Sequence, residues 1–323
     1  MRRRELVGAT AALLPFIPGI SFADESADSW PGKPVRIIVP FAPGGSNDVM
    51  ARKLAQRLNE SFNQPFIVEN RAGAGSVIGS NVVAHANGDG YTLLFISSTI
   101  TTTPAIQKLP YNPMSDLTPI CTIASSPFYV LTRNDFPAKT MKEFISYAKN
   151  NPRMINYGTA GYGDSAQLAS ELMSNLVDIK MQAIAYQGIT PAQLDLVTGR
   201  IDMLITTIAS IRGTPAENLP KIAITTKDRS GDFPRIPTVQ ETIGKDYNVD
   251  VWWGMFAGKN APASVQTRLG QEIKKIIYTD EFKKFLETLG AAPDYRLPEE
   301  MKKTMEKEIA IWKKVAEQAG ISK

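Results

Sequence analysis

Short runs of β-branched and aliphatic residues alternate along the chain with longer segments whose apolar residues recur every three or four positions. The short runs predict strands, and the longer period predicts amphipathic helices. Such alternation is typical of a doubly wound α/β sheet. The expected strands lie at 35–39, 66–69 and 91–96 in the first half of the chain, and at 155–157, 183–186, 201–205 and 221–225 in the second.

The strands and helices form two similar blocks, and this repetition predicts two lobes. About 300 residues also exceed the usual size of a single hydrophobic core. We place the crossings between the lobes near 128–131 and 251–254, so that the second lobe is an insertion within the first. Residues 24–128 and 253–323 are then domain 1, and residues 129–252 are domain 2.

The C-terminal part of the chain predicts helices at 265–289, broken near Thr279 and Asp280, and at 298–319. In the last helix, apolar residues recur at spacings of three and four, which indicates one buried stripe. The stripe consists of Met301, Met305, Ile309, Trp312 and Ala316.

The first residues have the layout of a secretory signal peptide. Three arginines, Arg2 to Arg4, precede an uncharged apolar stretch that ends in the small residue Ala23,. This stretch is too short to span a bilayer. We expect residues 1–23 to be removed on export to the periplasm, by either the general secretory route or the twin-arginine route.

Composition excludes several classes of function. The chain has 36 Lys+Arg and 32 Asp+Glu, and removing the three arginines and one glutamate of the leader leaves 33 and 31. Without a long basic run, nucleic acid is not an expected partner. The single cysteine, Cys121, forms no intramolecular disulfide, and the single histidine, His85, does not support a His-rich metal site,. No cofactor or metal is expected.

Glycine-rich segments follow the predicted strands of both blocks. Gly44 and Gly45 follow the first strand, and Gly158, Gly161 and Gly163 recur in the second block. In such sheets ligands bind where strands end and helix N-termini converge, and free N–H groups there suit carboxylate or phosphate. These loops have neither a Lys nor an Arg, nor the ending of a P-loop. An anion would therefore be held by backbone N–H groups, hydroxyls and helix dipoles.

Six motifs lie in order along the mature chain: VPFAPGG at 39–45, VENRAGAG at 68–75, DGYTLL at 89–94, YGTAG at 157–161, YQG at 186–188 and WGMFA at 253–257. Together they resemble the periplasmic solute-binding proteins of tripartite tricarboxylate transporters, often called Bug receptors. The resemblance covers essentially the whole mature chain.

This resemblance implies a periplasmic-binding-protein-like (Venus flytrap) fold, with two doubly wound α/β domains joined by crossing strands and the ligand between them. It implies a monomer that delivers a small carboxylic acid to the membrane components of a tripartite tricarboxylate transporter. Dicarboxylates, amino acids, nicotinate-like acids and aromatic acids are the implied ligands. The ligand contacts implied by position are Phe41, Ala42, Pro43, Gly45, Ser97, Ser98, Thr159, Ala160, Gly161, Tyr186, Gly188 and Asp202.

Three places depart from the family pattern where side chains would meet the variable part of the ligand. The loop after Gly161 often continues with a Ser-His or similar pair, but residues 164–167 read Asp-Ser-Ala-Gln. The residue before Tyr186 is often Pro and is Ala185 here, and Ile-Thr at 189–190 replaces smaller residues. The identity of the acid is therefore left open.

Two functions other than a transport receptor are considered. A periplasmic sensor that presents its ligand-bound form to a sensor kinase would use the same fold. An enzyme acting on a carboxylated substrate is disfavoured, because the sequence shows no nucleophile–base pair. Asp48 is expected to cap a helix. Asp202 is expected either to bind a cationic group of the ligand or to hold a loop by hydrogen bonds.

Overall fold

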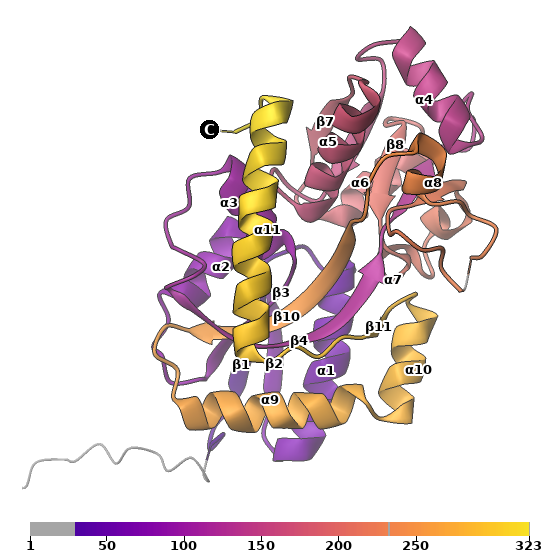
Figure 1. The fold of residues 1–323 in the computed structure, drawn as a ribbon. Coiled ribbons are helices and arrows are strands. Elements are labelled where there is room, and N and C mark those ends of the chain that lie inside the picture. The colour runs from indigo at the N-terminus through magenta and orange to yellow at the C-terminus, as the bar shows by residue number, and fades with distance from the viewer. Residues whose placement is uncertain (1–29, 232, 323) are drawn as a thin grey trace, which may run out of the picture.

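The computed structural model describes residues 30–231 and 233–322 of the 323-residue chain. The expected leader, residues 1–23, lies outside the described residues. None of the helices in these two ranges is long and apolar enough to cross a membrane. The described chain forms two α/β lobes, each built on one sheet (Figure 1).

The first lobe contains a six-stranded sheet of order β11-β4-β10-β3-β1-β2. The strand β1 runs parallel to β2 and β3, whereas β10 runs antiparallel to β3 and β4. The bounds are β1 (Val35–Val39), β2 (Phe66–Asn70), β3 (Thr92–Ser97), β4 (Leu117–Pro127), β10 (Asp250–Gly258) and β11 (Ala292–Pro293).

Helices cover both faces of this sheet. Neighbouring residues of β1 point to opposite faces, so Ile37 and Ile38 belong to different apolar clusters,. The expected break near Thr279 is confirmed, because the Thr279 side chain caps a new helix by accepting a hydrogen bond from Phe282 N (3.3 Å). The helices are α1 (Ser46–Phe62), α2 (Val77–Ala84), α3 (Thr99–Ile106), α9 (Ala263–Ile277), α10 (Asp280–Thr288) and α11 (Pro298–Ala319), with a short 3₁₀ turn at Ala74–Ser76.

The second lobe contains a five-stranded sheet of order β7-β6-β8-β5-β9. Its strands are β5 (Tyr129–Thr132), β6 (Asn156–Thr159), β7 (Gln182–Ala185), β8 (Met203–Thr206) and β9 (Lys221–Ile224). Its helices are α4 (Met141–Asn150), α5 (Ser165–Val177), α6 (Ile189–Val197), α7 (Ile208–Ile211) and α8 (Val239–Ile243), with a 3₁₀ turn at Pro215–Asn218.

Two extended segments connect the lobes. One leads from β4 through Phe128 into β5, and the other returns to β10 (Figure 1). Thr225 ties the two together, because its Oγ1 accepts from Phe128 N (3.0 Å) and donates to Val249 O (2.6 Å). The strand β10 pairs with the first sheet from Asp250 onward, three residues before the boundary predicted at 253.

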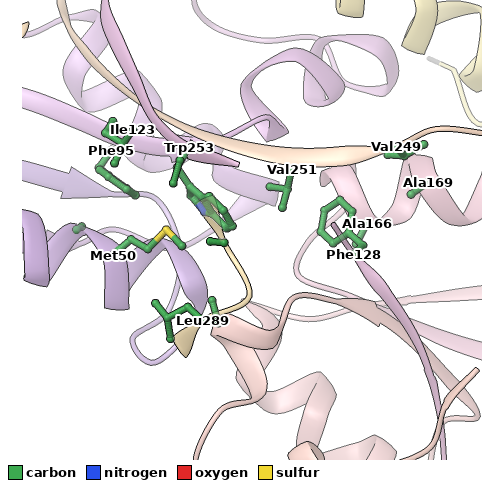
Figure 2. Close-up of a cluster of buried hydrophobic side chains, with 14 of the residues drawn as sticks. Met50, Phe95, Ile123, Phe128, Ala166, Ala169, Val249, Val251, Trp253 and Leu289 are labelled. Atoms are coloured by element: carbon green, nitrogen blue, oxygen red, sulfur yellow. The ribbon is translucent and has the colours of Figure 1, made fainter. Parts of the chain in front are cut away.

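Apolar side chains are packed continuously from one lobe to the other. Figure 2 shows this cluster running from Met50 and Phe95 in the first lobe, past Phe128 and Val251 at the crossings, to Ala166 on α5. All of these side chains are buried. In this conformation the two lobes therefore share one hydrophobic core beneath the cleft.

Candidate functional site

A small cavity of about 50 Å³ lies between the two lobes, at the ends of their strands. We call it the inner cavity. The residues of the first lobe that line it are Phe41, Ala42, Gly45, Ser46, Asn47, Ser97 and Thr99. Phe128 and Val251 line it from the two crossing segments. The second lobe lines it with Ala160, Asp164, Ser165, Ala166, Ile189, Ile205, Thr206, Thr207 and Ser210.

Helices begin at this cavity from both lobes. The first residues of α1 and α5, Ser46 and Ser165, are both part of its wall. The first turn of a helix carries N–H groups that have no partner inside the helix, and the helix dipole adds positive potential there. The N-cap residue of α1 is Gly45, which has no side chain to satisfy these groups. Of the N–H groups in this first turn, Ser46 N donates to Ser210 Oγ and Asp48 N donates to Gly45 O, while the positive end of the helix dipole still faces the cavity wall,.

Two buried polar atoms in the cavity wall have no hydrogen-bond partner. They are Oδ1 of Asn47 in the first lobe and Oγ1 of Thr206 in the second. Asn47 is 8% exposed and Thr206 is 2% exposed. Leaving such an atom unsatisfied costs about 1–3 kcal/mol. They belong to two residues, one from each lobe, that line the inner cavity.

A second, larger cavity of about 210 Å³ adjoins the first, and we call it the outer cavity. Phe41 and Ala160 line both cavities. Ser76 also lines the outer cavity, is 1% exposed, and has an Oγ without a partner. Gly161 and Tyr186, both expected ligand contacts, belong to its wall.

The lobes are closed on one another, and glycines allow the close approach. Gly161 has φ +151°, and a Cβ at this position would lie 2.7 Å from Cα of Gly75 in the opposite lobe. Hydrogen bonds also join the lobes: Thr102 Oγ1 donates to Gly163 O (2.7 Å). The first residue of α1 takes part too, since Ser46 N donates to Ser210 Oγ (3.2 Å).

The structure brings most of the expected ligand contacts to the cleft between the lobes. Phe41, Ala42, Gly45, Ser97 and Ala160 line the inner cavity, and Gly161 and Tyr186 line the outer one.

The other five expected contacts, Pro43, Ser98, Thr159, Gly188 and Asp202, line neither cavity. Pro43 O accepts from Thr190 Oγ1 of the second lobe (3.2 Å). A Cβ on Gly188 would lie 3.0 Å from Cβ of Ala42, so this residue too is at the contact between lobes. Ser98 and Thr159 are buried behind the wall.

The expectation that Asp202 lies near the cleft floor is corrected by the structure. Asp202 precedes β8, whereas the cavity lies at the other end of this strand, at Thr206. Its carboxylate pairs with Arg133 (2.9 Å) and accepts from Asn156 N (2.9 Å). Of the two roles weighed from the sequence, the structure supports the hydrogen-bond partner of a loop.

Asp48 also differs in detail from its expected role. Gly45, not Asp48, is the N-cap of α1. The Asp48 carboxylate instead accepts from Gly44 N (3.0 Å) and Asn70 Nδ2 (2.9 Å) and pairs with Arg52 (2.9 Å). Burial opposes ionisation of Asp48, but these hydrogen bonds outweigh it and lower its pKa,. Asp48 thereby stabilises the glycine loop through its hydrogen bond with Gly44 N.

Asp164 is the only titratable residue among the described residues that line the inner cavity. It caps α5, where Oδ1 accepts from Gln167 N (2.8 Å) and Oδ2 from Ala160 N (2.7 Å). Burial raises the pKa of Asp164 to about 7, although both hydrogen bonds act in the opposite direction,.

Sequence reasoning missed the contribution of β8 and α7 to the site. Thr206, Thr207 and Ser210 line the inner cavity. The signal for them was the polar pair at 206–207 directly after an apolar strand. Within residues 30–231 and 233–322, no group of three or more His, Cys, Asp or Glu residues is placed to hold a metal ion.

Two α/β lobes joined by crossing strands, with two helices beginning at a cavity between them, form the architecture of a solute-binding protein. A family model described as "Tripartite tricarboxylate transporter family receptor" matches residues 50–321. The chain belongs to this family, which is a family of periplasmic solute-binding receptors and not of enzymes.

Relatives in sequence and structure agree with this assignment. Protein BugT of Bordetella pertussis is 32% identical over 302 residues, which cover 92% of this chain and 93% of BugT. A Rhodopseudomonas palustris protein solved with adipate has a TM-score of 0.86 and 31% identity, covering 91% of this chain and 99% of its own. MatC from the same species, solved with bound malate, has a TM-score of 0.84 and 28% identity, covering 88% and 99%.

Proposed function

We propose that this protein captures a small carboxylate-bearing solute between its lobes and delivers it to the membrane components of a tripartite tricarboxylate transporter. It acts in the periplasm as a monomer, after residues 1–23 have been removed. The observation that carries the proposal is the inner cavity, which lies between the lobes where α1 and α5 both begin and is lined by several hydroxyl side chains. Adipate and malate bound in the related structures support the same class of ligand.

The solute is held without a cation from the protein. No Lys, Arg or His is among the described residues that line either cavity. A buried carboxylate needs compensation, and nearby hydroxyls together with the positive end of the α1 dipole supply it. The hydroxyls at hand in the cavity wall include those of Ser97, Thr206 and Thr207. We propose the cleft residues Phe41, Ala42, Gly45, Ser97, Ala160, Gly161 and Tyr186 as ligand contacts.

Thermal unfolding with a panel of small acids tests the proposal. A ligand at a hundredfold excess over its dissociation constant stabilises the native state by about 2.7 kcal/mol. That should raise the melting temperature by several degrees. We expect at least one mono- or dicarboxylic acid, with or without an amino group, to give this shift. The matched control is the amide of the same acid, which should give none.

If the amide shifts the melting temperature as much as the acid, the protein does not recognise a carboxylate. Delivery is a separate question that requires the membrane components. Retention of the ligand-loaded protein by those components is the expected result. Retention by a sensor-kinase ectodomain instead would replace the transport role with sensing.

A further inference from the structure

One face of helix α3 in the first lobe lies against loop 162–165 of the second lobe. Ser165 N donates a hydrogen bond to Thr99 Oγ1 (3.3 Å), and Thr102 Oγ1 donates to Gly163 O (2.7 Å). Residues that are three apart in sequence lie on the same face of a helix. Thr99 and Thr102 therefore bind the second lobe from neighbouring turns of α3.

Close backbone packing accompanies these hydrogen bonds. Gly163 has φ +91°, and a Cβ at this position would lie 3.0 Å from Ile106 Cγ1 and 3.3 Å from Thr103 Cα. At the end of the helix, the side-chain amide of Gln107 donates to Tyr162 O. The contact with the second lobe thus extends along the whole of α3.

Thr102 takes part in this contact from outside the ligand site. Its side chain is 0% exposed and lines neither cavity. A hydroxyl has one hydrogen, and that of Thr102 goes to Gly163 O (2.7 Å) because Thr99 O lies farther away (3.2 Å),. This bond joins the two lobes, so it exists only while they are closed. It therefore stabilises the closed arrangement alone.

The neighbouring threonine has a different partner. Thr101 Oγ1 donates to Glu308 of α11 (2.8 Å), which belongs to the first lobe. Threonine is a weak helix former, because its branched side chain loses freedom in a helix. In α3 the hydroxyls of these threonines serve two purposes: Thr101 fixes the helix within its own lobe, whereas Thr99 and Thr102 bind the other lobe.

Closure of the lobes and retention of a solute are linked. A solute enclosed between the lobes leaves only after the lobes separate. Its apparent affinity also depends on the fraction of the protein that is in the closed arrangement. A hydrogen bond that stabilises closure therefore slows the release of a solute that it does not touch.

We propose that α3 is a latch, in which the hydroxyls of Thr99 and Thr102 and the amide of Gln107 bind loop 162–165 and prolong the closed arrangement. Thr102 then determines how long a solute is retained, although it lies outside both cavities. The part of this inference that concerns the solute rests on the proposed function.

The Thr102→Val variant tests the latch, because valine has the shape of threonine without the hydroxyl. The probe is the acid of the panel that raises the melting temperature most, with adipate and malate included in the panel. A chase with excess unlabelled acid measures the dissociation rate of the labelled acid. We expect dissociation about fivefold faster than from the wild type, as the loss of one hydrogen bond implies.

Two matched variants control for changes in packing. Thr102→Ser keeps the hydroxyl and should release the acid at the wild-type rate, within about twofold. Thr101→Val removes a buried hydroxyl from the same helix, but one that bonds within the first lobe, and should also leave the rate unchanged. An unchanged rate in Thr102→Val, or an equal rise in Thr101→Val, would overturn the latch.

Hydrogen exchange without any ligand tests the latch independently of the proposed function. The Ser165 amide is bonded to Thr99 across the cleft, so it exchanges when the lobes separate,. We expect exchange about twofold faster, or more, in Thr102→Val than in the wild type. Equal exchange rates would overturn the latch. If no acid of the panel binds, the proposed function fails, and this comparison alone decides on the latch.

The Gln107→Ala variant provides the same test if Thr102→Val does not fold. Gln107 is half-buried and lines neither cavity. Its replacement removes another hydrogen bond to the second lobe and should speed both the release of the acid and the exchange of the Ser165 amide. Wild-type rates in both measurements would overturn the latch.

Discussion

At Gly161 the backbones of the two lobes meet, and the absence of a side chain is what permits it. A Cβ there would come 2.7 Å from Gly75 Cα and 3.1 Å from Gly75 N. Both obstructing atoms belong to the backbone, so neither can move aside as a flexible side chain could. Gly75 is constrained in the same way, because its own Cβ would lie 2.1 Å from Tyr162 O.

The Gly161→Ala variant should therefore fold but close poorly. Its ligand-induced rise in melting temperature should fall to less than half of the wild-type value at the same ligand concentration. Alanine also resists the positive φ of this position. Gly244→Ala is the control for that strain, because Gly244 has φ +64° and a Cβ there would meet nothing within 4 Å. A full ligand shift in Gly161→Ala would show that this contact is not needed for capture.

At this scale the sequence located the glycine loops of the cleft but not the residues that they contact across it. The glycine loops at 44–45 and 158–163 were recognisable because glycines directly after a strand mark a tight turn that lets the backbone approach a neighbour closely. Their pairing across the cleft, as between Gly161 and Gly75, was not, because it depends on how two lobes close. Asp202 was misplaced for a related reason: the sequence does not say which end of β8 faces the ligand.

A buried glutamate on α11 links this helix to the first lobe by hydrogen bonds. Glu308 accepts hydrogen bonds from the Trp252 indole Nε1 (2.9 Å) and from Thr101 Oγ1 (2.8 Å). Burial raises the pKa of Glu308 above its ordinary value. The same helix packs on α3 and also contacts α5 of the second lobe (Figure 1). Just beyond the end of α11, Ile321 O accepts a hydrogen bond from Tyr162 OH of the second lobe (3.2 Å).

The Glu308→Ala variant should lose about 1–3 kcal/mol of unfolding free energy, because it leaves the buried Trp252 N–H without an acceptor. Glu308→Gln keeps one acceptor oxygen and should lose less. The control is Glu306→Ala on the exposed face of the same helix, with a change within about 0.5 kcal/mol,. Urea unfolding measures all three. Equal losses in Glu308→Ala and Glu306→Ala would contradict this role.

Among the elements, the apolar pattern of the sequence predicts α11 well, whereas the residues of α3 do not favour a helix. The period of α11 predicted its bounds, 298–319, and four of the five stripe residues are buried, with Ile309 only partly so. The helix α3 carries a run of β-branched residues and an internal proline, which locally disfavour a helix,. It forms in a buried setting, where Thr103 Oγ1 bonds back to Thr99 O (2.9 Å).

In the whole molecule, the described chain crosses between the two lobes in two extended segments, which Thr225 ties together. Such a connection permits the lobes to open and close about it. In this arrangement the inner cavity lies between the lobes, beside the first residues of α1 and α5. A solute held there must therefore touch both lobes at once.

Hydrogen exchange with and without a saturating acid from the panel tests this capture between the lobes most directly. We predict slower exchange in segment 45–48 of the first lobe and in segments 164–167 and 206–210 of the second, all of which border the inner cavity. The helices α4 and α9, which do not line either cavity, should exchange unchanged. Protection confined to one lobe, or absent from all three segments, would contradict capture of the solute between the lobes.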